Sequence, residues 1–243
     1  MVMPRLAPVH AAFLNGWNRH MIDVRAITDL HRNLVERWHT QEVDNPFAEN
    51  DFLSLVCQQH QKNFLLWHQE DIARSPSAGD AVIAEVKRTI DRLNQERNDY
   101  IERIDEFLLE QLKAWGTVPR PQAKLNTETP GSAIDRLSVL ALRIYHMEEQ
   151  AHRSDADAQH RAKAEQRLTI LRTQLADLAK ALQELLNDIL AGRKRLKVYR
   201  QFKMYNDPTL NPYLYGKQGN QGVRCDGIAG PGSDSSDARL SAA

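Results

Sequence analysis

The segment from 90 to 105 places a charged side chain in an apolar helical seam. Apolar residues recur there at steps of three and four, and Arg97 occupies the same register. A guanidinium that faces a core must be paired, because an uncompensated buried charge is strongly destabilising. The polar residues beside it are Asp91, Asn94, Gln95, Asn98, Glu102 and Asp105. This pattern predicts either a structural ion-pair network that sets the helix register, or a polar pocket that binds an anion between helices.

A second polar cluster runs from Trp67 to Arg74. Trp67, Glu70 or Asp71, and Arg74 share one face of a helix by their spacing. Two adjacent carboxylates could bind a hard divalent cation such as Mg²⁺ with help from other helices. The alternative, which the spacing favours, is an ion pair between Glu70 and Arg74 at a solvated helix end.

A third cluster follows Thr129, where a helix N-terminus could hold an anion with its free N–H groups. Arg136 and Arg143 lie two turns apart on one face of this helix. His146 has Glu149 at i+3, an arrangement typical of a base with an orienting carboxylate. A structural or solvated histidine is the alternative. Further candidate ligand-binding residues in this region are Asn126, Asp135 and Tyr145.

Glu-x-x-His occurs twice, at 36–39 and 149–152. A four-helix di-iron site uses two such motifs and a Glu from each of two other helices, for which Glu70 and Glu102 are candidates. The motif is short enough to arise by chance, and both histidines adjoin predicted helix ends. We therefore do not favour a di-iron site.

The elements that position these residues are predicted to be helices. Turn-forming residues at 44–46, 75–79 and 115–121 separate segments with a helical apolar period, and no segment alternates convincingly like a strand. Capping boxes are expected at 77–80 and at 154–157. The predicted helices span about 22–40, 50–74, 80–111, 129–153 and 154–189. The fold class is therefore all-α, a single antiparallel bundle of about five helices with long third and fifth helices.

The fifth helix carries an uninterrupted leucine seam from Leu168 to Ile189. At 1.5 Å per residue it would be roughly 55 Å long, which exceeds the needs of a compact globule. We expect part of this coiled-coil-like seam to reach a second protomer, which predicts a homo-oligomer. The bundle domain should span 21–215, after a flexible N-terminus at 1–20 and before a Gly- and Ser-rich disordered tail at 216–243.

The composition narrows the choice of partners. The 243 residues include 32 Lys plus Arg and 32 Asp plus Glu, so no global charge favours nucleic acid or an anionic membrane. The basic segment 193–203, which ends in Lys203, could contact phosphates and stack bases through its aromatic residues, but such runs are usually solvated helix ends. No apolar run approaches the ~18 residues of a membrane span, and the first fifteen residues make a poor secretion signal. The two cysteines, Cys57 and Cys225, imply no disulfide framework. We expect a cytoplasmic protein.

Several short motifs occur together in one order, at 66–71 with Arg74, and at 90–99, 126–130, 134–138, 144–147 and 201–208. In these motifs, which cover about residues 45–215, the chain resembles a bacterial family catalogued as domain of unknown function 4254. The family has no established activity. Its members look like neighbours of cell-envelope polysaccharide genes, so the resemblance implies a sugar-phosphate or nucleotide-sugar setting. The family pattern does not depend on His39 or His152.

The leading hypothesis is an all-α enzyme that binds a nucleotide or sugar phosphate in a polar pocket between helices. The anion would be held by Arg97, Arg136 or Arg143. The residues expected to hold Mg²⁺ or to transfer protons are Glu70, Asp71, Asp91, Glu102 and His146. A helical nucleotide pyrophosphohydrolase is the nearest known type, although its acidic motifs are only partly echoed at 102–105. The alternatives are a non-catalytic helical interaction module and nucleic-acid binding through 193–203.

Overall fold

A computed structural model describes residues 22–49, 51–204 and 207–215 of the chain. The helices are α1 (Val24–Trp38), α2 (Phe52–Ala73), α3 (Asp80–Ala114), α4 (Pro130–His152), α5 (Ala158–Leu190) and the single turn α6 (Pro212–Tyr215). The two strands, β1 (Lys124–Leu125) and β2 (Lys194–Arg195), pair in parallel. The prediction of an all-α protein is confirmed, and the expectations for 1–20 and 216–243 lie outside the described residues.

The helix starts follow the side chains that can cap them. Asp51 caps α2, and the predicted cap Asn50 lies outside the described residues. Thr129 caps α4 through Ser132 N–H with Pro130 in the first turn, as the sequence predicts. The two predicted capping boxes are wrong. Helix α3 begins after Gly79 without a side-chain cap, and α5 is capped by Asp157 rather than by Ser154.

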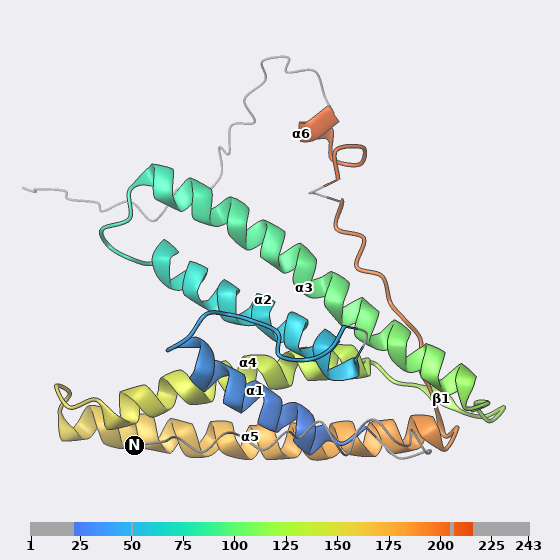
Figure 1. Ribbon diagram of the computed structural model, residues 1–243. Coiled ribbons are helices and arrows are strands. Elements are labelled where there is room, and N and C mark those ends of the chain that lie inside the picture. Colours follow the sequence, from blue (N-terminus) through green and yellow to red (C-terminus); the bar gives the residue numbers. More distant parts are fainter. Residues whose placement is uncertain (1–21, 50, 205–206, 216–243) are drawn as a thin grey trace, which may run out of the picture. The chain divides into compact units, whose positions relative to one another are not determined.

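The chain divides into two compact units, Met1–Gln201 and Phe202–Ala243. Within the first unit, α2 lies along α3 and α4 lies along α5, while α1 packs mainly against α4 (Figure 1). The core between them is apolar and includes Ile27, Val35, Ile104, Leu137 and Leu182. The described part of the second unit carries Lys203 and exposes Phe202 and Tyr213.

The leucine seam of α5 packs largely within its own chain. Leu168, Leu182 and Ile189 are buried, and Leu175 and Leu178 pack against the core. Helix α5 ends at Leu190, so the basic run after it is a short strand and irregular chain rather than the end of a helix. None of the described helices is long and apolar enough to cross a membrane.

One close contact fixes the start of α4 against α3. Gly131 N–H donates to the Asp105 carboxylate at 2.8 Å, and a Cβ on Gly131 would lie 2.5 Å from the Ile101 carbonyl oxygen. Burial raises the pKa of Asp105 to about 6, although its hydrogen bonds with Thr129 and Gly131 act in the opposite direction. Asp105, which the sequence places beside Arg97, thus serves the packing of two helices.

Candidate functional site

Three histidines from different parts of the chain converge where α1, α2 and α4 meet. His39 follows the last residue of α1, His68 lies in α2 and His146 in α4. Each offers a ring nitrogen, and these three atoms all lie within 4.8 Å of one another. All three side chains are half-buried. We call this cluster the histidine trio.

The backbone orients the ring of His39. Its Nδ1 lies 2.7 Å from the Val35 carbonyl oxygen, which can only accept, so Nδ1 carries the proton and Nε2 keeps a lone pair. That Nε2 is buried and has no hydrogen-bond partner among the described residues. Tyr145 stacks on the ring with centroids 4.1 Å and planes 17° apart. His39 is therefore held with a free acceptor.

A carboxylate orients His146 in the same way. Its Nδ1 donates to Glu149 at 2.7 Å, so its Nε2 is the acceptor. This Nε2 is also buried, and nothing in the described part of the chain hydrogen-bonds to it. Trp67 lies parallel to the ring, with centroids 4.7 Å and planes 8° apart. A carboxylate on the outer nitrogen is the usual companion of a histidine that binds a metal.

His68 completes the trio from α2. Its ring centroid lies 5.2 Å from that of His39 and 5.9 Å from that of His146. Burial lowers the pKa of His68, and the two neighbouring imidazoles lower it further, although Asp71 and Glu149 act in the opposite direction. The neutral ring is thus favoured, and this is the form that binds metals.

This donor set suits a particular class of ion. Neutral imidazole nitrogens favour Zn²⁺, Fe²⁺, Cu²⁺ or Ni²⁺, whereas Mg²⁺ prefers oxygen ligands. Three histidines around a tetrahedral Zn²⁺ leave a fourth position open, as in catalytic rather than structural zinc sites. Zn–N bonds near 2.1 Å would place the nitrogens roughly 3.4 Å apart, a modest contraction of the observed cluster.

Three of the four carboxylates that the sequence assigned to a cation are engaged in ion pairs. Glu70 pairs with Arg74 at 2.5 Å, which confirms the ion pair considered for this helix end. Asp91 pairs with Lys87, and Glu102 pairs with Arg200. Asp71 lies near enough to the trio for its charge to raise the pKa of His68, but it does not belong to the group of possible metal ligands. The metal-binding group that the described residues bring together is therefore histidine rather than carboxylate.

The residues considered for a di-iron site are also dispersed. His152 Nδ1 lies 2.8 Å from the Glu148 carbonyl oxygen on an exposed stretch of α4. Glu70 and Glu102 are held by arginines, and His39 belongs to the histidine trio. Within the described chain, these glutamates and histidines do not come together as the ligands of a di-iron site.

Arg97 belongs to a second polar cluster, between α2, α3 and α4. Its Nε lies 3.9 Å from the Asp135 carboxylate, which accepts hydrogen bonds from Gln59 at 2.6 Å and Asn63 at 3.0 Å. Burial raises the pKa of Asp135, against the effect of Arg97. The other members are His60 and Ser138. We call this cluster the Asp135 network.

His60 ties the network to α1. Its Nε2 donates to the His31 carbonyl oxygen at 3.1 Å, and its Nδ1 accepts from Ser138 Oγ at 2.7 Å. Burial lowers the pKa of His60 to about 3, so the ring is neutral. The sequence did not single out Gln59, His60 or Asn63, because polar residues surround α2 on several sides and leave no clear apolar stripe.

The remaining predicted residues lie at separate places. Gln95 donates to Asp99, Arg136 pairs with Glu128, and Asn126 contacts Glu128 and Lys194. Arg143 lines a groove between α4 and α5. Asn94 lies half-buried and Asn98 buried in α3. The structure thus distributes the predicted site over several regions and brings His146, Trp67 and Tyr145 together at the histidine trio.

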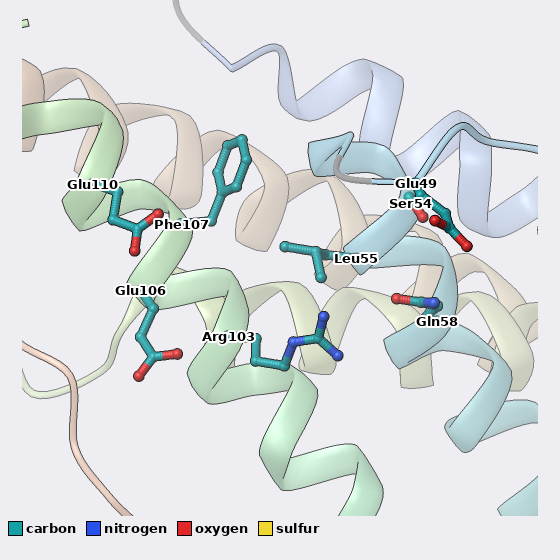
Figure 2. A pocket seen from close by; sticks show the side chains of 8 residues that line it. All are labelled: Glu49, Ser54, Leu55, Gln58, Arg103, Glu106, Phe107 and Glu110. Atoms are coloured by element: carbon teal, nitrogen blue, oxygen red, sulfur yellow. The ribbon is translucent and has the colours of Figure 1, made fainter. Parts of the chain in front are cut away.

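A separate pocket of about 520 Å³ lies between α2 and α3. Figure 2 shows Arg103 of α3 and Gln58 of α2 extending toward each other, with Glu106 and Glu110 along α3. Glu106 already binds Arg200. None of the predicted site residues lines this pocket, and its acidic groups do not converge as the three histidines do.

Comparison with curated proteins gives no match, and comparison with solved structures gives none. Comparison with models of protein families gives a match over residues 53–198. This range includes His68, His146 and all of the Asp135 network except the His31 carbonyl. These residues make up more than half of the 243-residue chain, so the protein belongs to the family described as protein of unknown function (DUF4254).

Proposed function

We propose that the protein binds a divalent transition metal, with Zn²⁺ as the best fit, through His39, His68 and His146. The observation that carries this proposal is the pair of buried Nε2 atoms. Each belongs to a ring whose Nδ1 is already fixed, and no described residue hydrogen-bonds to either of them. Leaving acceptors unpaired in the interior is unfavourable unless a ligand takes them up.

We infer that the metal serves catalysis rather than folding alone. A bound Zn²⁺ with an open position acidifies water and polarises a substrate oxygen, which suits hydrolysis. Glu149 would hold His146 in the ligating tautomer, and Tyr145 and Trp67 would fix two of the rings from the side. We further propose that the five long helices form one antiparallel bundle, in which the metal links α1, α2 and α4.

A phosphorylated small molecule remains the proposed substrate. A groove of about 710 Å³ between α4 and α5 is lined by Arg136 and Arg143, and Arg143 lies one turn before His146. Glu128 pairs with Arg136, whereas the described residues offer Arg143 no ion pair, so it supports anion binding. With p-nitrophenyl phosphate as a probe, Arg143→Gln should raise KM while the metal affinity stays unchanged.

Metal binding by the full chain is the primary test. Purified protein stripped with a chelator should bind about one equivalent of Zn²⁺ in calorimetry, and Co²⁺ should give the visible absorption of a tetrahedral site. His39→Gln, His68→Gln and His146→Gln should each weaken binding by more than about 100-fold, beyond the typical effect of an outer-shell partner. The matched control is His152→Gln, which removes a histidine six residues along α4.

The comparison with this control decides the proposal. If His152→Gln behaves like the wild type and the three trio variants do not, the ion lies at the trio. If Zn²⁺ does not bind in a saturable way, or if all four variants bind equally, the trio is a structural cluster of stacked rings. Circular dichroism of each variant should show that the helices remain.

A further inference from the structure

A small cavity of about 70 Å³ lies between α1, α4 and α5. Its walls are mainly apolar and include Val35, Leu137, Ala141 and Leu175. Of the charged groups that line it, Arg32 pairs with Asp29 and Glu148 pairs with Arg172, whereas Glu36 is exposed to solvent and forms no ion pair with the described residues. The walls of the cavity are thus mainly apolar, and its charged groups are either paired or exposed to solvent.

His31 is the buried polar side chain in the wall of this cavity. It is 1% exposed, and neither ring nitrogen has a hydrogen-bond partner within the described chain. Burial holds the pKa of His31 well below its usual range, and the nearby His60 lowers it further. A neutral imidazole has one N–H donor and one acceptor nitrogen, and neither forms a hydrogen bond with the described residues. Buried polar groups in folded proteins are almost always paired, so we expect a bound molecule or water to form a hydrogen bond with His31.

The cavity has room for more than one water. A single water needs roughly 10–15 Å³ of such space, so the volume corresponds to a few non-hydrogen atoms. Waters alone would have few partners, because most of the wall is apolar and a stable internal water makes about three hydrogen bonds. An occupant with an apolar body and one polar group matches the walls better.

We propose that this cavity binds a small uncharged molecule that has a branched alkyl body and a hydroxyl or primary amide group, which pairs with His31. The alkyl body lies against Val35, Leu137 and Leu175. A charged ligand is disfavoured, because its charge would lose hydration without a buried counter-charge. This site is separate from the histidine trio and does not depend on a bound metal.

The cavity nevertheless adjoins the trio. Tyr145 lines the cavity and stacks on His39, and Val35 lines it and accepts the hydrogen bond from His39 Nδ1. A molecule in the cavity therefore contacts the two residues that orient one metal ligand. If the metal binds as proposed, we expect occupancy of the cavity to alter its affinity.

The probes are isobutyramide and isobutyrate, which have nearly the same shape and differ in charge. In the metal-free full chain, long-range ¹H–¹⁵N NMR of the imidazoles should show saturable shifts of His31 with isobutyramide. Isobutyrate should bind at least about tenfold more weakly, because of the cost of burying its charge. The His31 resonances are assigned with His31→Phe.

A second variant keeps His31 and fills the space. Ala141→Leu should abolish the isobutyramide shifts, whereas Ala151→Leu, near the end of the same helix, should retain them. Equal binding of the amide and the carboxylate would show that the cavity does not select an uncharged molecule, and shifts that stay linear without saturation would show that neither probe occupies it. Either result would overturn the proposal. His68→Gln should leave isobutyramide binding intact, so a failed metal site and a failed cavity site give different results.

Discussion

The histidine trio and the Asp135 network are both polar clusters built mainly by α2 and α4, yet they use their polar atoms differently. In the Asp135 network the carboxylate accepts two side-chain hydrogen bonds and faces Arg97, and His60 uses both of its ring nitrogens. In the trio, two histidines use only their outer nitrogens and keep the inner ones free.

This difference separates a structural role from a binding role. Groups that pair with one another stabilise a unique packing of helices. In the Asp135 network the carboxylate of Asp135 and both ring nitrogens of His60 are paired, although Gln59 Oε1 and Arg97 Nε have no hydrogen-bond partner among the described residues. Three histidines that each bring a ring nitrogen within 4.8 Å of the others, two of them with an unpartnered Nε2, are instead prepared for a ligand. The two clusters therefore make opposite predictions, since changes in the network should lower stability and changes in the trio should lower metal affinity.

The largest effect is expected from Asp135→Ala. Removing this carboxylate leaves Gln59 and Asn63 without their shared acceptor and Arg97 without its ion-pair partner, and breaking a buried charged cluster typically costs about 3–5 kcal/mol. We expect about 3 kcal/mol less free energy of unfolding in urea, since Arg97 is partly exposed. Arg97→Met, which removes a pair 3.9 Å apart, should lose less, about 1 kcal/mol.

Both variants should bind Zn²⁺ like the wild type at temperatures where they are folded. A loss of Zn²⁺ affinity in Asp135→Ala with unchanged stability would reverse the roles assigned to the two clusters. If Arg97→Met instead lost binding of a phosphorylated ligand in a stable protein, the anion pocket first considered for Arg97 would be restored.

Acid provides an intermediate effect on stability in the metal-free protein. The pKa of His60 is about 3 in the folded state and 6.5 in the unfolded chain, so protons favour the unfolded chain below pH 6.5. Between pH 7 and pH 5, His60 alone should remove about 2 kcal/mol. His31 acts in the same direction, since its pKa is also lowered.

Asp105 acts in the opposite direction. Its pKa is raised to about 6, so between pH 7 and pH 5 the carboxyl is protonated in the folded state but not in the unfolded chain. This protonation adds about 1 kcal/mol to the free energy of unfolding by pH 5. From His60 and Asp105 together we expect a net loss of about 1 kcal/mol in chemical denaturation at pH 5 relative to pH 7, and His31 should increase this loss. Equal stability at the two values would show that His60 is not held neutral. Asp105→Asn should make the loss steeper.

The sequence predicted the helices well because turn-forming residues separate segments with a clear helical period. It could not predict β1 and β2, because two-residue strands are too short to show alternation. The contact of His146 with Glu149 followed from i, i+3 spacing. His39 was set aside because it adjoins a helix end, but that position lets its ring reach two other helices.

The convergence of the trio was beyond sequence reasoning for a physical reason. The three histidines lie 29 and 78 positions apart along the chain, and only the packing of α1, α2 and α4 brings them together. His68 stood within the cluster at Trp67–Arg74, yet its neighbours in that helix drew attention to carboxylates. The helical period shows which residues share a face but not which faces of three helices meet.

The smallest effect is expected from the carboxylate that orients His146. Glu149→Gln keeps the size of the side chain but removes the charge that holds Nδ1–H, and outer-shell partners of this kind are worth 10–100-fold in metal affinity. Because the Glu149 side chain is 49% exposed, we expect the low end, about tenfold. Competition between Zn²⁺ and a chromophoric chelator at pH 7 measures it.

Glu148→Gln is the matched control, because it removes the neighbouring carboxylate of α4, which pairs with Arg172 rather than with the trio. The two variants have the same net charge, so any general electrostatic attraction for the cation falls equally in both. A tenfold loss in Glu149→Gln alone would show that the carboxylate acts through His146. Equal losses would mean that only the local negative charge matters, and His146 would then not need an orienting partner to bind the metal.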